Sequence, residues 1–159
     1  MKTKFHAPSF LPVAFLLALA VAFTMPAARS AEAEKTVVII ANDTLKFSIT
    51  QIQASPGQSV HVQLRNEGTL PKDSMGHNWI LLDDEAVAMP YAMAAMTARD
   101  ANYKPKALAA HVLAAIPLLG PKEVGDVTFN APTKPGKYPF ICSCTGHCMA
   151  GMRGDLIVK

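Results

Sequence analysis

Apolar and polar residues alternate along several short segments of this chain, and turn-forming sequences separate those segments. A β-branched run covers 36–41, and apolar positions then alternate with polar ones over 45–49 and again over 60–64. Such alternation indicates strands with one face in a core. Ser-Pro-Gly-Gln at 55–58 and Pro-Gly-Lys at 135–137 are typical of turns.

Four more short runs are mostly apolar and lie nearer the C-terminus. They cover 77–82, 127–129, 138–142 and 156–158. Seven to eight short strands with turns between them predict an all-β fold, an antiparallel sandwich or barrel.

One segment, 84–119, breaks the alternation because it is rich in Ala and Met. Met89, Met93 and Met96 have helical spacing. We expect a single helical excursion over about 84–119 that packs on the outside of the sheets, with these methionines filling gaps in the core. His111, in the same segment, is expected to be an ordinary surface or core histidine.

The N-terminus has the pattern of a secretory signal peptide. Lys2 and Lys4 precede an apolar run over 10–25, and small residues follow over 27–33. An uncleaved anchor is less favoured, because the run is shorter than the roughly 20 residues of a spanning helix and contains Pro12. We therefore expect 1–33 to be removed near 30–33, leaving 34–159 as one periplasmic or otherwise exported domain.

Removal of the signal peptide changes the charge balance. Cleavage after residue 30 would remove Lys2, Lys4 and Arg29, so Lys+Arg would fall from 15 to 12 and equal the 12 Asp+Glu. The remaining chain has no basic stripe suited to nucleic acid. We expect no nucleic-acid partner and no membrane span after cleavage.

The three cysteines lie within one seven-residue stretch, at 142, 144 and 148. Disulfide-stapled exported domains instead spread an even number of cysteines along the chain. An odd, clustered set beside His147 and Met152 favours metal chemistry.

The spacing Cys142-x4-His147-x4-Met152 supplies a thiolate, an imidazole and a thioether from one loop, and His77 supplies a second imidazole from a distant strand. Two His and one Cys in a plane with a weak axial Met form a copper electron-transfer site. Such a set needs no open position for a substrate, which argues against an enzyme. Folding must bring His77 to the loop.

Longer stretches around these residues resemble cupredoxins of the azurin and auracyanin type. The similarity covers nearly the whole mature chain. It is carried by 70–72, 75–79, 110–111, 126–129, 138–142, 146–147 and 152–154, and the Cys-to-His and His-to-Met intervals match auracyanin.

The resemblance implies a Greek-key sandwich holding one type 1 copper ion through His77, Cys142, His147 and, weakly, Met152. It implies that the Gly76 carbonyl lies opposite Met152 at longer range. It also implies that Asn78 joins the two ligand segments, and that the backbone N–H groups of Asn78 and Cys144 point at the Cys142 sulfur.

The resemblance further implies an apolar docking patch around the edge of the His147 ring. Through this patch a monomeric carrier would exchange electrons in transient encounters with a donor and an acceptor protein. The patch residues would be Leu70, Pro71, Met75, Gly146, Met149 and Ala150.

Cys144 and Cys148 depart from the family pattern. They could be free thiols, a disulfide, or ligands of a second metal. The stripe of Met89, Met93 and Met96 could likewise be a second copper surface.

We favour a one-electron carrier. Copper storage or delivery by a thiolate-rich loop is the alternative, and nothing in the sequence supports an enzyme.

Overall fold

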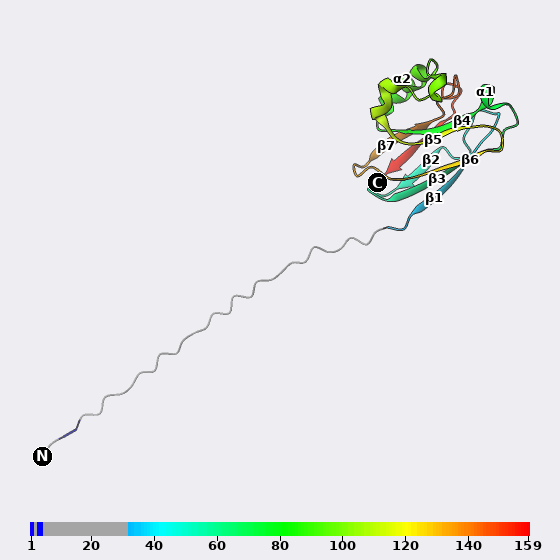
Figure 1. Cartoon of the computed structure of the whole chain (residues 1–159). Coiled ribbons are helices and arrows are strands. Elements are labelled where there is room, and N and C mark those ends of the chain that lie inside the picture. Colours follow the sequence, from blue (N-terminus) through cyan, green and yellow to red (C-terminus); the bar gives the residue numbers. More distant parts are fainter. Residues whose placement is uncertain (2, 5–31) are drawn as a thin grey trace. The chain divides into compact units, whose positions relative to one another are not determined.

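The structure is a computed structural model that describes residues 1, 3–4 and 32–159 (Figure 1). It separates into the units Met1–Ser30 and Ala31–Lys159, and the helices and strands lie in the second. Residues 5–31 of the predicted signal peptide lie outside the described residues, so the expected cleavage stays a prediction. Among the described residues, no helix has the length and apolar character needed to cross a membrane.

Eight strands form two sheets, which confirms the predicted all-β fold. The three-stranded sheet has the order β1 (Lys35–Ala41), β3 (Ser59–Asn66) and β6 (Val124–Asn130). The five-stranded sheet has the order β2 (Gln51–Ala54), β8 (Arg153–Val158), β7 (Gly136–Ile141), β4 (His77–Leu82) and β5 (Val112–Leu119).

The sheets are mixed, so the expectation of a purely antiparallel sandwich is wrong. β1 pairs with β3 in parallel, and β2 pairs with β8 in parallel, while the remaining pairs are antiparallel. After β1 the chain crosses to the other sheet to form β2 before it returns as β3. Such a crossover lets β3 re-enter the first sheet in the direction of β1.

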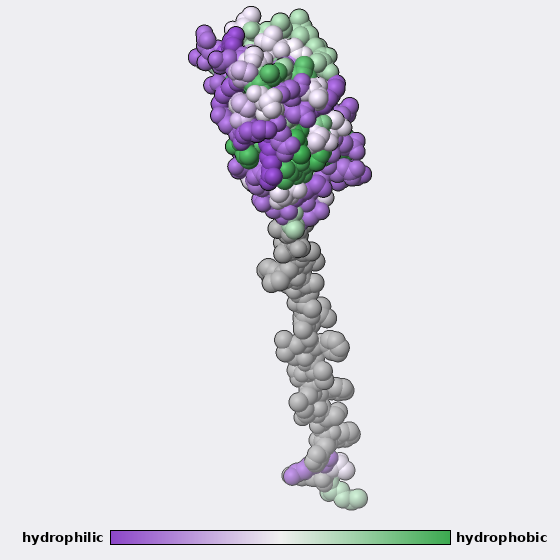
Figure 2. Space-filling view, turned by 90° about the vertical axis from the view of Figure 1, so that its right-hand side faces the viewer, coloured by the Kyte–Doolittle hydropathy of each residue, from purple (hydrophilic) through white to green (hydrophobic). Residues whose placement is uncertain are grey.

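The core lies between the sheets and is built from inward-facing alternate residues. Val60, Val62 and Leu64 of β3 are fully buried. In the other layer, the Trp79 ring lies 5.5 Å from the Phe140 ring, centroid to centroid. Burying a large apolar side chain contributes roughly 1.5–3 kcal/mol, so this core provides a rigid frame for the strand ends. On the face drawn in Figure 2, hydrophilic side chains surround apolar patches.

The strand expected over 45–49 does not form. Only an isolated bridge joins Phe47 to Ala41, and the strand lies instead at 51–54. Leu45 has a positive φ of 59°. This left-handed conformation interrupts extended pairing, although the buried Phe47 still reaches the core.

The predicted helical excursion is shorter than 84–119. It contains α2 (Glu85–Ala95) and two 3-10 helices, η1 (Arg99–Ala101) and η2 (Lys106–His111). Residues 112–119 form β5 instead, paired with β4. Small alanines in β5 conceal its period-two pattern. A single helical turn, α1 (Lys72–Met75), precedes β4 and was not predicted.

Two methionines of α2 and the one that directly follows it do not fill the core. Met89, Met93 and Met96 are 39%, 61% and 43% exposed. The helix instead buries its small face, with Ala88 and Ala92, against Ile141 of β7 and Ile80 of β4. Small side chains allow the helix to approach the sheet closely, and this leaves the long thioethers outside.

Candidate metal centre

The candidate ligands lie where three strands begin or end. His77 is the first residue of β4, Cys142 directly follows β7, and Met152 directly precedes β8. β4 lies antiparallel to β7, and β7 lies antiparallel to β8. The start of β4, the end of β7 and the start of β8 therefore lie at one end of the five-stranded sheet. The distant His77 is brought to the Cys142–Met152 loop in this way.

His77, Cys142 and His147 converge at this end of the sheet. One ligand atom from each lies within 4.8 Å of the other two. Cys142 Sγ is 3.4 Å from His147 Nδ1, and the two imidazole centroids are 5.1 Å apart. All three side chains are buried. Within the described part of the chain, this is the one group of three or more His, Cys, Asp or Glu residues that is close enough to hold a metal ion.

The buried polar atoms fit a metal ion. Both ring nitrogens of His77 are buried without a hydrogen-bond partner among the described residues. Such atoms are costly to bury unless they bind something. Burial raises the pKa of the Cys142 thiol, but the neighbouring side chains of Cys144, His147 and His77 outweigh burial and hold this pKa well below its ordinary value. A ready thiolate beside two imidazoles suits copper.

Comparisons with known proteins agree with this chemistry. Residues 33–159 match the family described as copper binding proteins, plastocyanin/azurin family. The chain belongs to this family. It is 34% identical over 131 residues to azurin of Pseudomonas fluorescens biotype C, covering 80% of this chain and all of that azurin. It is also 34% identical over 127 residues to auracyanin-B of Chloroflexus aurantiacus, covering 79% of this chain and 52% of auracyanin-B.

A solved structure gives the same family relationship. The structure titled auracyanin A, a "blue" copper protein from Chloroflexus aurantiacus, superposes with a TM-score of 0.70 at 34% identity, covering 80% of this chain and 100% of that one. The present chain is thus a cupredoxin of the azurin and auracyanin type, and it is a copper electron carrier with a His-Cys-His group able to hold one ion.

The loop of this cupredoxin between β7 and β8 is closed by its own backbone. The Cys142 N–H donates to the Met152 carbonyl at 3.0 Å, and the Met152 N–H donates to the His147 carbonyl at 2.9 Å. Met152 is fully buried. These bonds fix three of the predicted ligands relative to one another. The sequence spacing implied a compact loop, but not this pairing.

A buried side-chain pair joins the two ligand segments. Asn78 Nδ2 donates to Ser143 Oγ at 2.8 Å, and the Ser143 N–H donates to Asn78 Oδ1 at 2.8 Å. Ser143 Oγ in turn donates to the Tyr103 carbonyl at 2.7 Å. Sequence reasoning identified Asn78 but missed Ser143. The sequence signal that could have identified Ser143 is a polar residue directly after a ligand, at the end of an apolar strand.

All three cysteines are free and buried, and the two extra ones have different surroundings. Cys144 belongs to the main core, whereas Cys148 packs with Ala88, Tyr91 and Ala92 of α2. The hydrogen bond to Cys142, reinforced by burial, raises the pKa of the Cys144 thiol, and burial raises that of Cys148. The structure therefore has no disulfide between Cys144 and Cys148.

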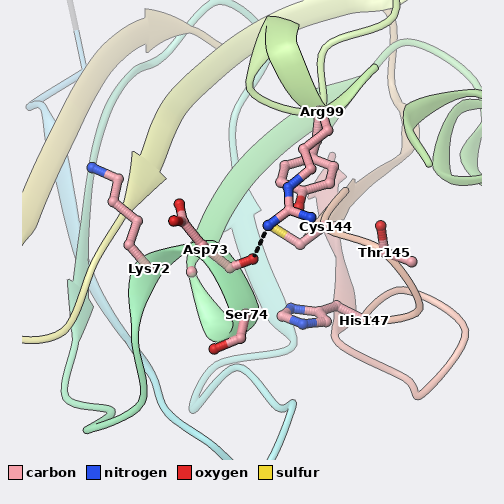
Figure 3. Close-up of a pocket in the computed structure, with 9 residues that line it drawn as sticks. Lys72, Asp73, Ser74, Arg99, Cys144, Thr145 and His147 are labelled. Carbon is pink, nitrogen blue, oxygen red and sulfur yellow. Dashed lines mark hydrogen bonds between the residues drawn. The ribbon is translucent and has the colours of Figure 1, made fainter. Parts of the chain in front are cut away.

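The predicted docking residues lie at or near the surface. Leu70 is 44% and Met149 is 52% exposed, whereas the ring of His147 is only 5% exposed. Pro71 and Ala150 are also exposed, and Met75 and Gly146 are partly buried. His147 also borders a small pocket with polar walls (Figure 3).

Proposed function

We propose that the chain works as an exported, monomeric type 1 copper carrier. In this proposal residues 1–33 direct export and are removed near 30–33, and 34–159 is the working domain. The charged and apolar pattern of the N-terminus supports export. The convergence of His77, Cys142 and His147 within 4.8 Å carries the functional part of the proposal.

His77, Cys142 and His147 would hold the ion, with Met152 and the Gly76 carbonyl as weaker ligands. Copper, when bound, supplies a Cu(I)/Cu(II) couple that takes up and releases one electron. The chain supplies a site whose groups are held before the ion arrives, since Asn78 and Ser143 tie one segment to the other. The proposal also assigns the N–H groups of Asn78 and Cys144 to the Cys142 sulfur.

Electrons are proposed to leave and enter through the His147 ring. The proposal has the edge of this ring face the docking patch of the sequence analysis, in which Leu70 and Met149 are exposed. Small apolar contacts favour short-lived encounters, as a carrier between a donor and an acceptor needs. A buried ligand set with no open position supports a carrier without a catalytic reaction of its own.

The test is the colour of the purified protein. We expect Cu(II) to give an intense band at roughly 600 nm, the thiolate-to-copper transition of this ligand type. The band should bleach on mild reduction and return on oxidation. Cys142→Ser should abolish it, and Cys148→Ser, which changes a buried thiol outside the ligand group, is the matched control. A colourless protein that binds only Cu(I) would contradict the proposal and favour copper delivery.

A further inference from the structure

A pocket of about 190 Å³ lies directly beside His147. Its wall is polar and comes from three separate segments: the α1 turn, the η1 turn and the ligand loop. Lys72, Asp73 and Ser74 come from the first, Arg99 from the second, and Thr145 and His147 from the third (Figure 3). The volume suits a group the size of one side chain.

Arg99 and Asp73 are the charged residues of this wall that form no ion pair within the described residues. The Arg99 guanidinium donates to the Asp73 carbonyl at 2.7 Å, and no carboxylate of the described residues forms an ion pair with it. Figure 3 shows the Asp73 carboxylate turned away from the guanidinium. Lys72, in contrast, is paired with Glu123 at 2.9 Å. Guanidinium N–H groups therefore remain free to bind an anion.

The free groups match a carboxylate. A guanidinium has five N–H donors in a planar fork that binds both oxygens of a carboxylate. One donor is used by the Asp73 carbonyl. The exposed hydroxyl of Thr145 lies in the same wall and offers another donor. Because the Asp73 carboxylate of the same wall is turned away from the guanidinium (Figure 3), the free donors of Arg99 and Thr145 beside His147 favour an anionic partner group.

We propose that this pocket receives a carboxylate side chain from the docking surface of an acidic redox partner protein. The apolar patch provides non-directional contact, and the Arg99 site fixes the orientation of the partner over His147. This inference rests on the proposed function, because it requires electrons to pass through His147. Charges at the rim of an interface act mainly on the association rate and its salt dependence.

A purely structural role for Arg99 makes a different prediction. Its hydrogen bond to the Asp73 carbonyl needs only a neutral donor, so Arg99→Gln keeps a donor and removes the charge. The matched control is Lys134→Gln, which removes the same charge from an exposed loop just before β7. The six residues of β7 separate that loop from Cys142, a distance of roughly 20 Å at the rise of a strand.

The experiment measures electron exchange of the copper-loaded protein with two small probes. Hexacyanoferrate(III) is the anionic probe, and tris(phenanthroline)cobalt(III) is the cationic one. At low ionic strength, we expect Arg99→Gln to slow the reduced protein's reaction with hexacyanoferrate about 2- to 5-fold and to flatten its salt dependence. The reaction with the cobalt complex should not slow, and Lys134→Gln should change neither rate.

A binding measurement identifies the pocket itself. Acetyl-Glu-Glu-Glu-amide is titrated into the labelled protein while amide resonances are followed, with acetyl-Gln-Gln-Gln-amide as the neutral control. Salt-sensitive shifts at Asp73, Arg99 and Thr145, caused only by the acidic peptide and lost in Arg99→Gln, are expected. Equal shifts in Arg99→Gln, or equal hexacyanoferrate rates, would overturn the inference. A blue, reversibly reducible protein with either result would leave the carrier function intact.

Discussion

Asn78 and Ser143 exchange two hydrogen bonds of 2.8 Å each in the buried interior. Asn78 directly follows His77, and Ser143 directly follows Cys142. The residues lie 65 positions apart in the chain, yet each positions the ligand before it. This pair links the fold to the metal centre, because it joins the residue after His77 directly to the residue after Cys142.

Replacement of Asn78 by Ala should therefore loosen both ligand segments. The buried N–H of Ser143 would lose its partner, whereas the Ser143 hydroxyl would lose the bond it accepts and keep the one it donates to the Tyr103 carbonyl. One orphaned buried group costs about 1–3 kcal/mol, so we expect the free energy of unfolding of the copper protein to fall by about that amount. Chemical denaturation measures it. Asn42→Ala removes a partly exposed asparagine that accepts from the Thr44 N–H, and it should cost below about 1 kcal/mol. Equal losses in the two variants would argue against the link.

Cys144 should tune the reduction potential without holding the ion. Its thiol hydrogen bonds to the Cys142 sulfur and lowers that sulfur's pKa. A donor to the ligand sulfur withdraws electron density and favours Cu(I). We expect Cys144→Ala to stay blue and to have a lower reduction potential, measured by redox titration.

Cys148→Ala is the control for that measurement, because Cys148 packs against α2 in a separate apolar cluster. It should leave the potential unchanged. A colourless Cys144 variant would show that Cys144 is itself a ligand, and an unchanged potential would show that its thiol does not act on the Cys142 sulfur.

The sequence was sufficient for β3 and for the His-Cys-His group, for a physical reason. Val60, Val62 and Leu64 alternate because one face of β3 lies in the core, and the burial agrees. His77 and Cys142 could be paired in advance because their residue types have a specific chemistry in common. The metal-binding chemistry of these residue types thus identified a contact that the alternation of apolar and polar residues along the chain could not.

Other features depend on tertiary packing and escaped prediction. Met89, Met93 and Met96 have helical spacing, but spacing does not say which helix face meets the sheet. The alanines of α2 pack there instead. The parallel pairing of β1 with β3 depends on the crossover through β2. Arg99 gave no signal, since its importance comes from its place beside His147 in the folded chain.

Tyr91 should make the protein sensitive to alkali. Its hydroxyl is buried without a partner among the described residues, and burial raises the pKa of Tyr91 to about 12 from 10.0. Between these values the unfolded chain loses the phenolic proton while the folded chain keeps it. The free energy of unfolding should therefore fall as pH rises from about 10 to about 12.

Tyr91→Phe tests this point, because it removes the hydroxyl and keeps the ring. We expect the alkaline loss to become shallower and the neutral-pH stability to rise by about 1 kcal/mol, since an unsatisfied buried group disappears. Denaturation at pH 7 and across the alkaline range measures both. An identical alkaline slope in the two proteins would mean that Tyr91 does not titrate as its burial implies.

Gly76 should tolerate no side chain, because it lies between α1 and the first ligand. A Cβ at this position would come within 2.6 Å of the Lys72 carbonyl oxygen and 2.8 Å of Leu118 Cδ1. The backbone must move, and His77 is the next residue. We expect Gly76→Ala to cost about 1–3 kcal/mol and to weaken and shift the visible copper band.

Gly57→Ala is the control, because φ is +77° there and no atom would lie within 4 Å of the added Cβ. It should cost about 1 kcal/mol through backbone strain alone and leave the band unchanged. If the band of Gly76→Ala matched that of the control, the α1 turn would not position His77.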